Sequence, residues 1–368
     1  MDANFTALAK TLHNEHLLKT EALFETKKFD WFASFAEHFQ ATCAEIHKLQ
    51  SASCLPAVSY LEYNMLYTNF INRRYAAEAA VYGKKSYLDK KQRMISAYDI
   101  APVFVYFDEL WNALNKTSKD FSGKVSPHDI THYMLREALP DFYFYVASIA
   151  RFAVMDCAYT KPFTEIIKND VFKINIGDYM VLTEPVYIYK KDKDAKKITD
   201  WFAQKLPLTY NFNDFSNLDF SGCQFQDNDL RYSYFRECVL VNTTFAESSL
   251  DGCCFYKADM EGCDLSDCIL YEANFERANL KNARFADSRA GLPGGRMWSH
   301  PGFLHANFRH TDLTGANFSA CNLFGADFTG ATLTDADFTG AILDNAVFSD
   351  TNLPLTEEQK SKIIIVKE

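Results

Sequence analysis

The side chains whose spacing could support chemistry lie in the first half of the chain. His128 and His132 are four residues apart, which places two imidazoles on one face of a helix, as in zinc sites. A zincin motif needs glutamate directly after the first histidine, and Asp129 occupies that position. Ser126 followed by Pro127 is typical of a helix start, so we interpret Asp129 as a capping residue. We therefore expect no metal at this pair.

Two further candidates are a cysteine and a glycine-rich stretch. Cys157 lies beside Asp156 and near Tyr159 and could be a nucleophile, but a buried structural thiol is the simpler interpretation. The glycines in residues 291–295 are not followed by Lys-Ser/Thr, so they match neither a phosphate-binding nor a dinucleotide-binding loop. We expect no catalytic residue and no cofactor. An enzyme in the first half stays open as an alternative.

Composition and charge narrow the class of protein. The chain has 368 residues, of which 48% are hydrophobic and 23% charged, as in ordinary globular proteins. No apolar run approaches the roughly 18 residues that cross a bilayer, and the charged N-terminus does not resemble a secretory signal. The net charge of −10 argues against direct nonspecific binding of nucleic acid.

The negative charge is confined to one part of the chain. Residues 1–210 hold 26 basic and 25 acidic residues, whereas residues 211–353 hold 9 basic and 20 acidic residues. The second segment therefore has a net charge of −11 and the first a net charge of +1. This asymmetry predicts two domains with a boundary near residue 210.

A period of five residues dominates the acidic segment. From Phe215 to Phe285, and again from Phe308 to Leu353, every fifth residue is Phe, Leu or Met. The residue two before each centre is usually small, and the residue one before is often Asp or Asn. A period of five fits neither a helix nor an ordinary strand. It predicts a coil with a corner every five residues and four sides per turn, with Asp and Asn bonding the local backbone at the corners.

This array resembles the pentapeptide-repeat family, with matching stretches such as ANLKNARFADS and ADFTGATLTDADFTGAILDNAVF. The resemblance implies a right-handed quadrilateral β-helix, called the rod below, over residues 211–353. Twenty-five quintets give about six coils, roughly 30 Å at the usual strand spacing. Residues 354–368 are expected to form a capping helix with Thr356 as N-cap, followed by an apolar tail.

Residues 1–210 are expected to form a mainly α-helical domain. Helical patterns predict helices, and β-branched and aromatic content from residue 171 to 190 predicts a hairpin. The expected helices span residues 30–49, 59–82, 99–114, 127–159 and 198–204.

Ten cysteines are present, and six occupy the small inward position of the repeat. No two of these six are 20 residues apart, so none should stack directly on another. We therefore expect buried free thiols, no disulfide in the rod and a reducing compartment, namely bacterial cytoplasm. The six are Cys223, Cys238, Cys253, Cys263, Cys268 and Cys321.

The chain end suggests self-association. An apolar tetrapeptide either folds back onto the last coil or pairs with a second chain across a two-fold axis. Proteins resembling this one often dimerise end to end, so we expect a homodimer. The tetrapeptide comprises Ile363, Ile364, Ile365 and Val366.

An insertion interrupts the repeat at residues 288–302. Its glycines and prolines break the inward pattern, so we expect a loop that projects from the coil. It contains residue types enriched in binding hot spots, which makes it a candidate partner-binding loop. The alternative is that Trp298 covers a neighbouring face. The candidate binding residues are Arg289, Arg296, Met297, Trp298 and His300.

The sequence thus favours a noncatalytic protein-interaction or scaffold protein that uses a rigid acidic β-helix as its binding surface. Two exposed ladders at 20-residue steps fit such a surface. We expect Arg231, Asp251 and Tyr271 to stack along one edge of the rod, and Arg236, Tyr256 and Glu276 to stack along another. One alternative rests on the resemblance: some pentapeptide-repeat proteins resemble duplex DNA in size and charge and bind DNA gyrase or topoisomerase IV. A further alternative is a secreted bacterial effector, because some effectors join a separate domain to such repeats.

Overall fold

The computed structural model describes residues 2–88, 93–121, 123–179, 183–291, 304–349 and 353–367. The chain forms two compact units, Met1–Ile188 and Tyr189–Glu368. None of the helices in the described ranges is long and apolar enough to cross a membrane.

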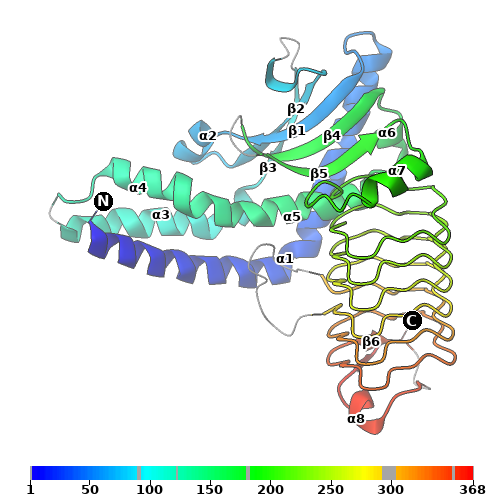
Figure 1. Ribbon diagram of the computed structural model, residues 1–368. Coiled ribbons are helices and arrows are strands. Elements are labelled where there is room, and N and C mark those ends of the chain that lie inside the picture. The colour runs from blue at the N-terminus through cyan, green and yellow to red at the C-terminus, as the bar shows by residue number, and fades with distance from the viewer. Residues whose placement is uncertain are drawn as a thin grey trace. The chain divides into compact units, whose positions relative to one another are not determined.

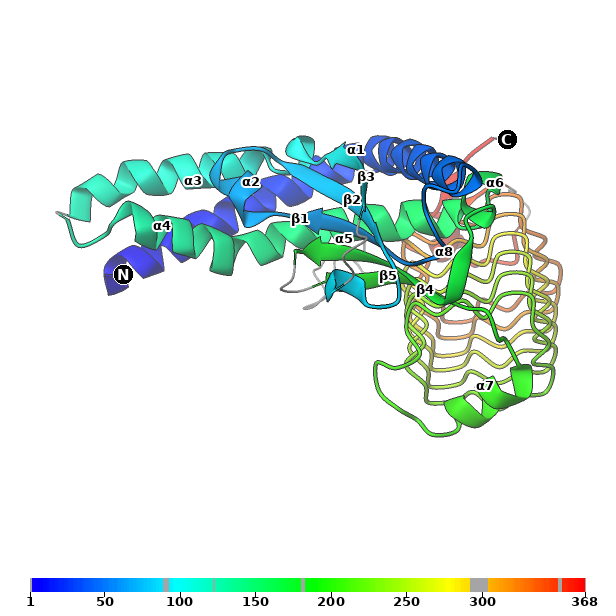
Figure 2. The ribbon, with the colours of Figure 1, turned by 90° about the horizontal axis from the view of Figure 1, so that it is seen from above.

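Helices form one layer of the first unit (Figures 1 and 2). The long helix α1 is capped at its N-terminus by Asp2, whose carboxylate accepts the backbone N–H of Asn4 at 3.0 Å. Helices α3 and α5 pack along it through aromatic contacts such as Phe24 with Tyr145, whose ring centroids are 5.1 Å apart. The helices are α1 (Ala3–Ser51), α2 (Tyr67–Ile71), α3 (Val105–Thr117), α4 (Pro127–Tyr133), α5 (Leu139–Cys157) and α6 (Lys161–Thr164).

A five-stranded mixed sheet forms the second layer, in the order β3-β2-β1-β4-β5. Strand β1 pairs antiparallel with β2 and parallel with β4. The expected hairpin near residues 171–190 corresponds to β4 and β5, which are neighbours in the sheet. The strands are β1 (Val58–Met65), β2 (Ala76–Tyr82), β3 (Arg93–Asp99), β4 (Lys168–Asp178) and β5 (Thr183–Lys190).

The helix expected over residues 59–82 is wrong, because this segment forms β1, α2 and β2. Alternation along β1 explains the error. Tyr63 faces α1, with its ring 5.0 Å from that of Phe35, whereas Glu62 and Asn64 belong to the opposite face of the sheet. Arg73, with a φ of 55°, turns the chain between the two strands.

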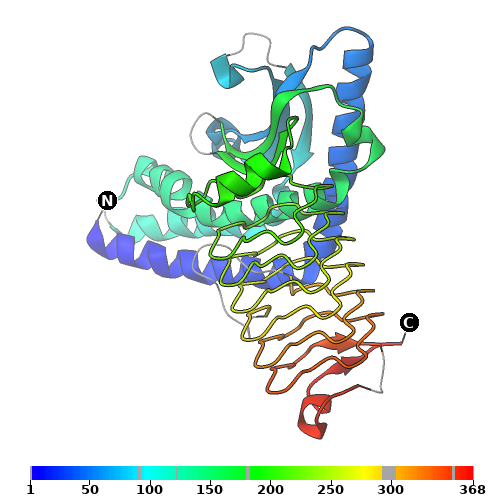
Figure 3. The same cartoon turned by 45° about the vertical axis from the view of Figure 1, so that its right-hand side comes forward.

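The second unit contains a stack of coils with four five-residue sides each (Figure 3). Parallel bridges join residues 20 apart, for example Asp214 with Tyr234 and Tyr234 with Cys254. The large inward side chains form columns. In one column the rings of Phe275, Phe308 and Phe328 are 5.0 and 4.9 Å apart and nearly parallel. Each coil is therefore held by contacts with its neighbours above and below.

Corner chemistry explains the Asp and Asn of the repeat. The residue just before each large inward residue often accepts, through its side chain, the backbone N–H of the residue just after that inward residue. Asp264 accepts from Ser266 at 3.0 Å, and Asn317 accepts from Ser319 at 2.8 Å. The residue two after each centre has a positive φ, as at Glu247 and Lys257. Part of the acidic composition of the rod is thus required by its backbone.

The insertion begins later than residue 288, the position expected from sequence. Arg289 pairs with Ile269 and Asn322, and Ala290 is fully buried at the inward position that Phe, Leu or Met occupies on other sides. The stacking offset rises from 20 to 33 residues, from Ile269–Arg289 to Arg289–Asn322, so thirteen extra residues separate Ala290 from Phe308. The sequence pattern places the start of the insertion too early, because Ala290 breaks the series of Phe, Leu and Met.

Both ends of the rod are covered by other segments of the second unit. Helix α7 (Ala195–Phe202) places Phe202 against Phe215 and Phe225, with ring centroids 5.0 and 4.9 Å away. At the other end, β7 (Ile364–Ile365) pairs parallel with β6 (Val347–Phe348), so the tail folds back onto the last coil. Ile364 and Ile365 nevertheless remain 46% and 42% exposed.

Helix α8 (Glu357–Lys360) has the expected capping box, formed by Thr356 and Gln359, and Gln359 does more than cap the helix. The side-chain oxygen of Gln359 accepts the N–H of Thr356, while its amide nitrogen donates to the carbonyls of Phe338 at 2.9 Å and Ala341 at 3.1 Å. One side chain therefore closes the helix and satisfies two carbonyls of the terminal coils.

Replacing Gln359 by glutamate tests this cap. Gln359→Glu keeps the acceptor for Thr356 but removes both donated bonds and directs a carboxylate at two carbonyls. We expect the free energy of unfolding to fall by about 1–3 kcal/mol, measured by urea denaturation. The control Glu358→Gln, at an exposed position, should change it by less than about 0.5 kcal/mol. Equal stability of the two variants would show that Gln359 does not cap the rod.

Candidate interaction surface

The histidine pair of α4 lies at a helix start that is capped as expected. Asp129 accepts the N–H of Ser126 at 2.8 Å, and the Ser126 hydroxyl accepts the N–H of Asp129 at 3.2 Å. The capping interpretation of Asp129 is therefore confirmed. Within the described ranges, no three His, Cys, Asp or Glu side chains are grouped so that they could hold a metal ion.

Cys157 lies in the core of the first unit. Its side chain is 2% exposed, and the amide of Gln40 donates to its sulfur at 3.5 Å. Burial raises the pKa of the Cys157 thiol, which opposes formation of the thiolate that a nucleophile needs. The geometry thus favours the structural interpretation.

Buried thiols of the rod donate hydrogen bonds to backbone carbonyls of the preceding coil. Cys253 and Cys263 donate to carbonyls 23 residues earlier at 3.0 and 2.9 Å, as the hydroxyl of Thr243 does at 2.8 Å. Cysteine therefore takes the place of serine or threonine in tying coils together. Burial raises the pKa of Cys263 and Cys268 to about 12.

All ten cysteines are free, and Cys54 is the exposed one among them. We expect a thiol reagent at neutral pH to modify Cys54 rapidly and the eight buried cysteines only on unfolding, because buried thiols are neutral and shielded. Cys223, which is partly exposed, should react at an intermediate rate. Titration in denaturant without reductant should find ten thiols. A count lower by two or more would demonstrate a disulfide.

Four exposed carboxylates are stacked along one corner of the rod. Each occupies the positive-φ position two after an inward centre, and each is separated from the next by one coil. The backbone bonds Asp227 N to Ala246 O, Glu247 N to Ser266 O and Asp267 N to Ala286 O fix this stacking at 2.9 to 3.0 Å. We call this set the acidic corner. It comprises Asp227, Glu247, Asp267 and Asp287.

No carboxylate of the acidic corner forms an ion pair with another of the described residues of the rod. The ion pairs found there involve other carboxylates, such as Asp214 with Lys193 and Asp229 with Arg231. Like charges on adjacent strands repel one another, so this ladder is an electrostatic cost that the fold does not require. It is therefore the part of the surface best suited to a cationic partner.

The ladders expected from 20-residue steps have different structures. Arg236 lies over the ring of Tyr256, 3.9 Å from its centroid, as a stacked pair. Arg231 instead turns toward Asp229, with two bonds of 2.8 Å, while Asp251 is 6% exposed. Burial raises the pKa of Asp251 to about 7. These residues belong to the coil structure more than to an open surface.

The candidate loop residues are only partly within the described chain. Arg289 lies on a side of the coil and is exposed. Beyond the insertion, the N–H of Leu304 donates to the carboxylate of Glu272 at 3.1 Å, which ties the returning chain to the coil. Arg296, Met297, Trp298 and His300 lie outside the described residues, so their proposed role rests on sequence.

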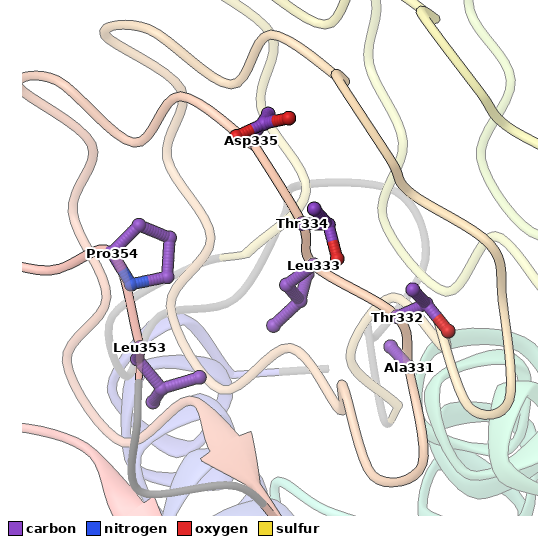
Figure 4. Close-up of a pocket in the computed structure, with 7 residues that line it drawn as sticks. All are labelled: Ala331, Thr332, Leu333, Thr334, Asp335, Leu353 and Pro354. Atoms are coloured by element: carbon purple, nitrogen blue, oxygen red, sulfur yellow. The ribbon is translucent and has the colours of Figure 1, made fainter.

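A groove of about 600 Å³ lies near the C-terminal end of the rod (Figure 4). It is lined by small, aliphatic and hydroxyl side chains, with Asp335 as the one acidic group among the lining residues. This set lacks the paired acid and base that general acid–base catalysis needs. The lining residues are Ala331, Thr332, Leu333, Thr334, Asp335, Leu353 and Pro354.

The fold and its repeating corners define the second unit as a solenoid of five-residue sides. A comparison of the sequence with models of protein families supports this description of the second unit. Residues 229–267, 258–289, 303–340 and 333–355 match the family model for pentapeptide repeats, in eight copies. Residues 229–355 are therefore a pentapeptide-repeat region, whereas the N-terminal unit is assigned to no family. No curated protein matches the chain.

Several solved structures resemble the repeat region. A pentapeptide repeat protein from the Arabidopsis thaliana thylakoid lumen is 23% identical over 40% of this chain and 74% of that chain, with a TM-score of 0.22. HetL from the cyanobacterium Nostoc, involved in heterocyst differentiation regulation, is 20% identical over 44% and 99%, with a TM-score of 0.14. QnrB1, a plasmid-mediated fluoroquinolone resistance protein, is 23% identical over 37% and 82%, with a TM-score of 0.15.

Proposed function

We propose that this chain is a noncatalytic interaction protein whose rod presents the acidic corner to a cationic surface of a protein partner. The main support is that four exposed carboxylates, which form no ion pair among the described residues of the rod, follow one corner at one-coil intervals. Stacked Phe and Leu columns fix the spacing of these groups, so little conformational entropy is lost when they are engaged. Long-range attraction to a basic partner would also speed association.

DNA-like binding of gyrase or topoisomerase IV is the second candidate, and the net negative charge of the rod permits it. Duplex DNA about 30 Å long carries roughly 18 phosphate charges. Residues 211–353 carry 20 acidic and 9 basic residues, a net charge of −11, or about 60% of that density. Much of this charge closes corners or forms ion pairs, so the acidic corner would contribute most of the phosphate-like surface.

Capture by the full-length protein tests the proposal. The variant Asp227→Asn/Glu247→Gln/Asp267→Asn/Asp287→Asn removes four charges with almost no change in side-chain volume. The control Asp259→Asn/Glu261→Gln/Asp335→Asn/Asp344→Asn removes four charges elsewhere on the rod. We expect partners retained by wild type and the control to be lost from the first variant. Equal retention by both variants would refute the acidic corner, and topoisomerase subunits among the lost proteins would select the second candidate.

We also infer that the insertion contributes to partner contact, as its sequence suggests. Replacing residues 292–303 by a short Gly/Ser linker should leave thermal stability nearly unchanged, because bridges such as Asn274–Asn307 join the coils on either side. Partner capture should be lost. Starting the replacement at Arg289 should instead destabilise the rod, since Arg289 and Ala290 belong to a coil. Retained capture without residues 292–303 would contradict this role.

A further inference from the structure

A second charged ladder, of opposite sign, runs along another corner of the rod. Lys257, Arg277 and His310 occupy the positive-φ position on successive coils, and Arg309 precedes His310. Backbone bonds from Lys257 N to Glu276 O and from Arg277 N to Arg309 O, both 3.0 Å, stack these rungs. We call these four residues the basic corner; they are exposed, on a rod that is otherwise acidic.

Intramolecular pairing of the basic corner is weak. Arg277 lies 3.6 Å from Glu276, and Arg309 lies 3.9 Å from Asp327, both longer than the roughly 2.7–2.9 Å of a hydrogen-bonded ion pair. The ammonium of Lys257 lies 5.4 Å from the Tyr256 ring centroid. Glu237 occupies the rung before Lys257 and ends the basic stretch. Three consecutive rungs therefore present cations to the outside.

The two ladders lie on diagonally opposite corners. The basic corner follows the side centred on Phe255, Phe275 and Phe308, and the acidic corner follows the side centred on Phe245, Leu265 and Phe285. These sides are two apart in a coil of four. A surface patch on one flank of the rod therefore cannot include both ladders.

We propose that the basic corner of one rod docks on the acidic corner of a second copy of this chain. Both ladders are built on the same coil, so their rungs have the same axial spacing and can match one to one without adjustment. A two-fold dimer needs the same surface patch on both copies. This contact joins two different corners that lie diagonally opposite on each rod, so it is heterologous and cannot form a two-fold dimer. Lateral association should therefore continue into open rows. The proposal does not depend on the proposed partner of the acidic corner.

Charge reversal in the full-length protein tests this association. Glu247→Lys/Asp267→Lys should abolish it, and so should Lys257→Glu/Arg277→Glu. The backbone tolerates these exchanges, because Glu237 and Lys257 adopt the same positive φ on one corner. A mixture of the two variants should recover association, since each then offers a complementary corner to the other. Glu261→Lys/Asp335→Lys, with the same change in net charge on another corner, is the control.

Sedimentation equilibrium at about 20 mM and about 500 mM salt provides the readout. For wild type and for the mixture, the weight-average mass at low salt should exceed twice the monomer mass as concentration rises, and it should fall toward the monomer at high salt. A monomer at low salt overturns the proposal. So does a mass that stops at the dimer, or association that both reversed variants retain. If a reversed variant is unfolded by circular dichroism, Glu247→Gln/Asp267→Asn replaces it and should weaken association.

Discussion

Phe308→Ala is expected to lower the free energy of unfolding of the repeat unit by about 3–5 kcal/mol. Phe308 is fully buried and is the first large inward residue after the insertion. Its ring stacks on Phe275 and Phe328 and meets Phe285 and Phe318 edge-on at 5.6 Å each. Removing it opens a cavity at the point where the coils before and after the insertion are joined.

Phe348→Ala is the matched control for this change. Phe348 belongs to the same column but lies in the terminal coil, where it contacts Phe328 at 4.9 Å and Phe338 at 6.4 Å. The loss of stability should therefore be clearly smaller than for Phe308. Urea unfolding followed by circular dichroism measures both. Equal losses would contradict a rod stabilised by neighbours on both sides of each coil.

Asp251→Asn is expected to stabilise the protein above neutral pH. Burial raises the pKa of Asp251 to about 7, and Arg231 and Arg289 only partly offset this effect. Oδ1 of Asp251 accepts no hydrogen bond from the described residues. Because the unfolded pKa is about 3.9, the charged carboxylate costs the folded state up to roughly 4 kcal/mol.

The cost is fully present above pH 7 and decreases as pH falls toward 4, because the folded state binds the proton more tightly than the unfolded state. Asp251→Asn should therefore gain about 2–4 kcal/mol over wild type at pH 8 and show little difference at pH 4. Asp229→Asn, on the same side, should have the opposite sign at pH 8, since Asp229 binds Arg231 through two bonds of 2.8 Å. Denaturant unfolding across this pH range measures both variants, and a pH-independent gain for Asp251→Asn would contradict the account.

The repeat could be predicted from sequence because its physical requirements recur every five residues. Each side needs a large and a small inward residue, and its corner needs a residue such as Asp264 or Asn317 that bonds the next backbone N–H. The start of the insertion could not be placed, because Ala290 fills an inward position that is elsewhere Phe, Leu or Met. A small residue there carries no signal of its own.

The first unit was less predictable, since tertiary packing decides its elements. The tyrosines of residues 59–82 suit a helical stripe, yet Tyr63 and Met65 are buried on one face of β1 and Glu62 and Asn64 on the other. The acidic corner had a usable signal, namely acidic residues at 20-residue steps beginning at Asp227. Sequence reasoning followed the position one after each centre, which gave the ladder of Arg231 and Asp251 instead.

Site-specific photo-crosslinking tests the proposed binding surface most directly. A photoreactive amino acid at position 247 lies on the acidic corner, and one at position 242 lies at the same positive-φ position on the preceding corner. We expect the full-length protein to crosslink to its partner from position 247 and not from position 242. Crosslinks from position 242 alone, or equal yields from both positions, would contradict the acidic corner as the surface that binds the partner.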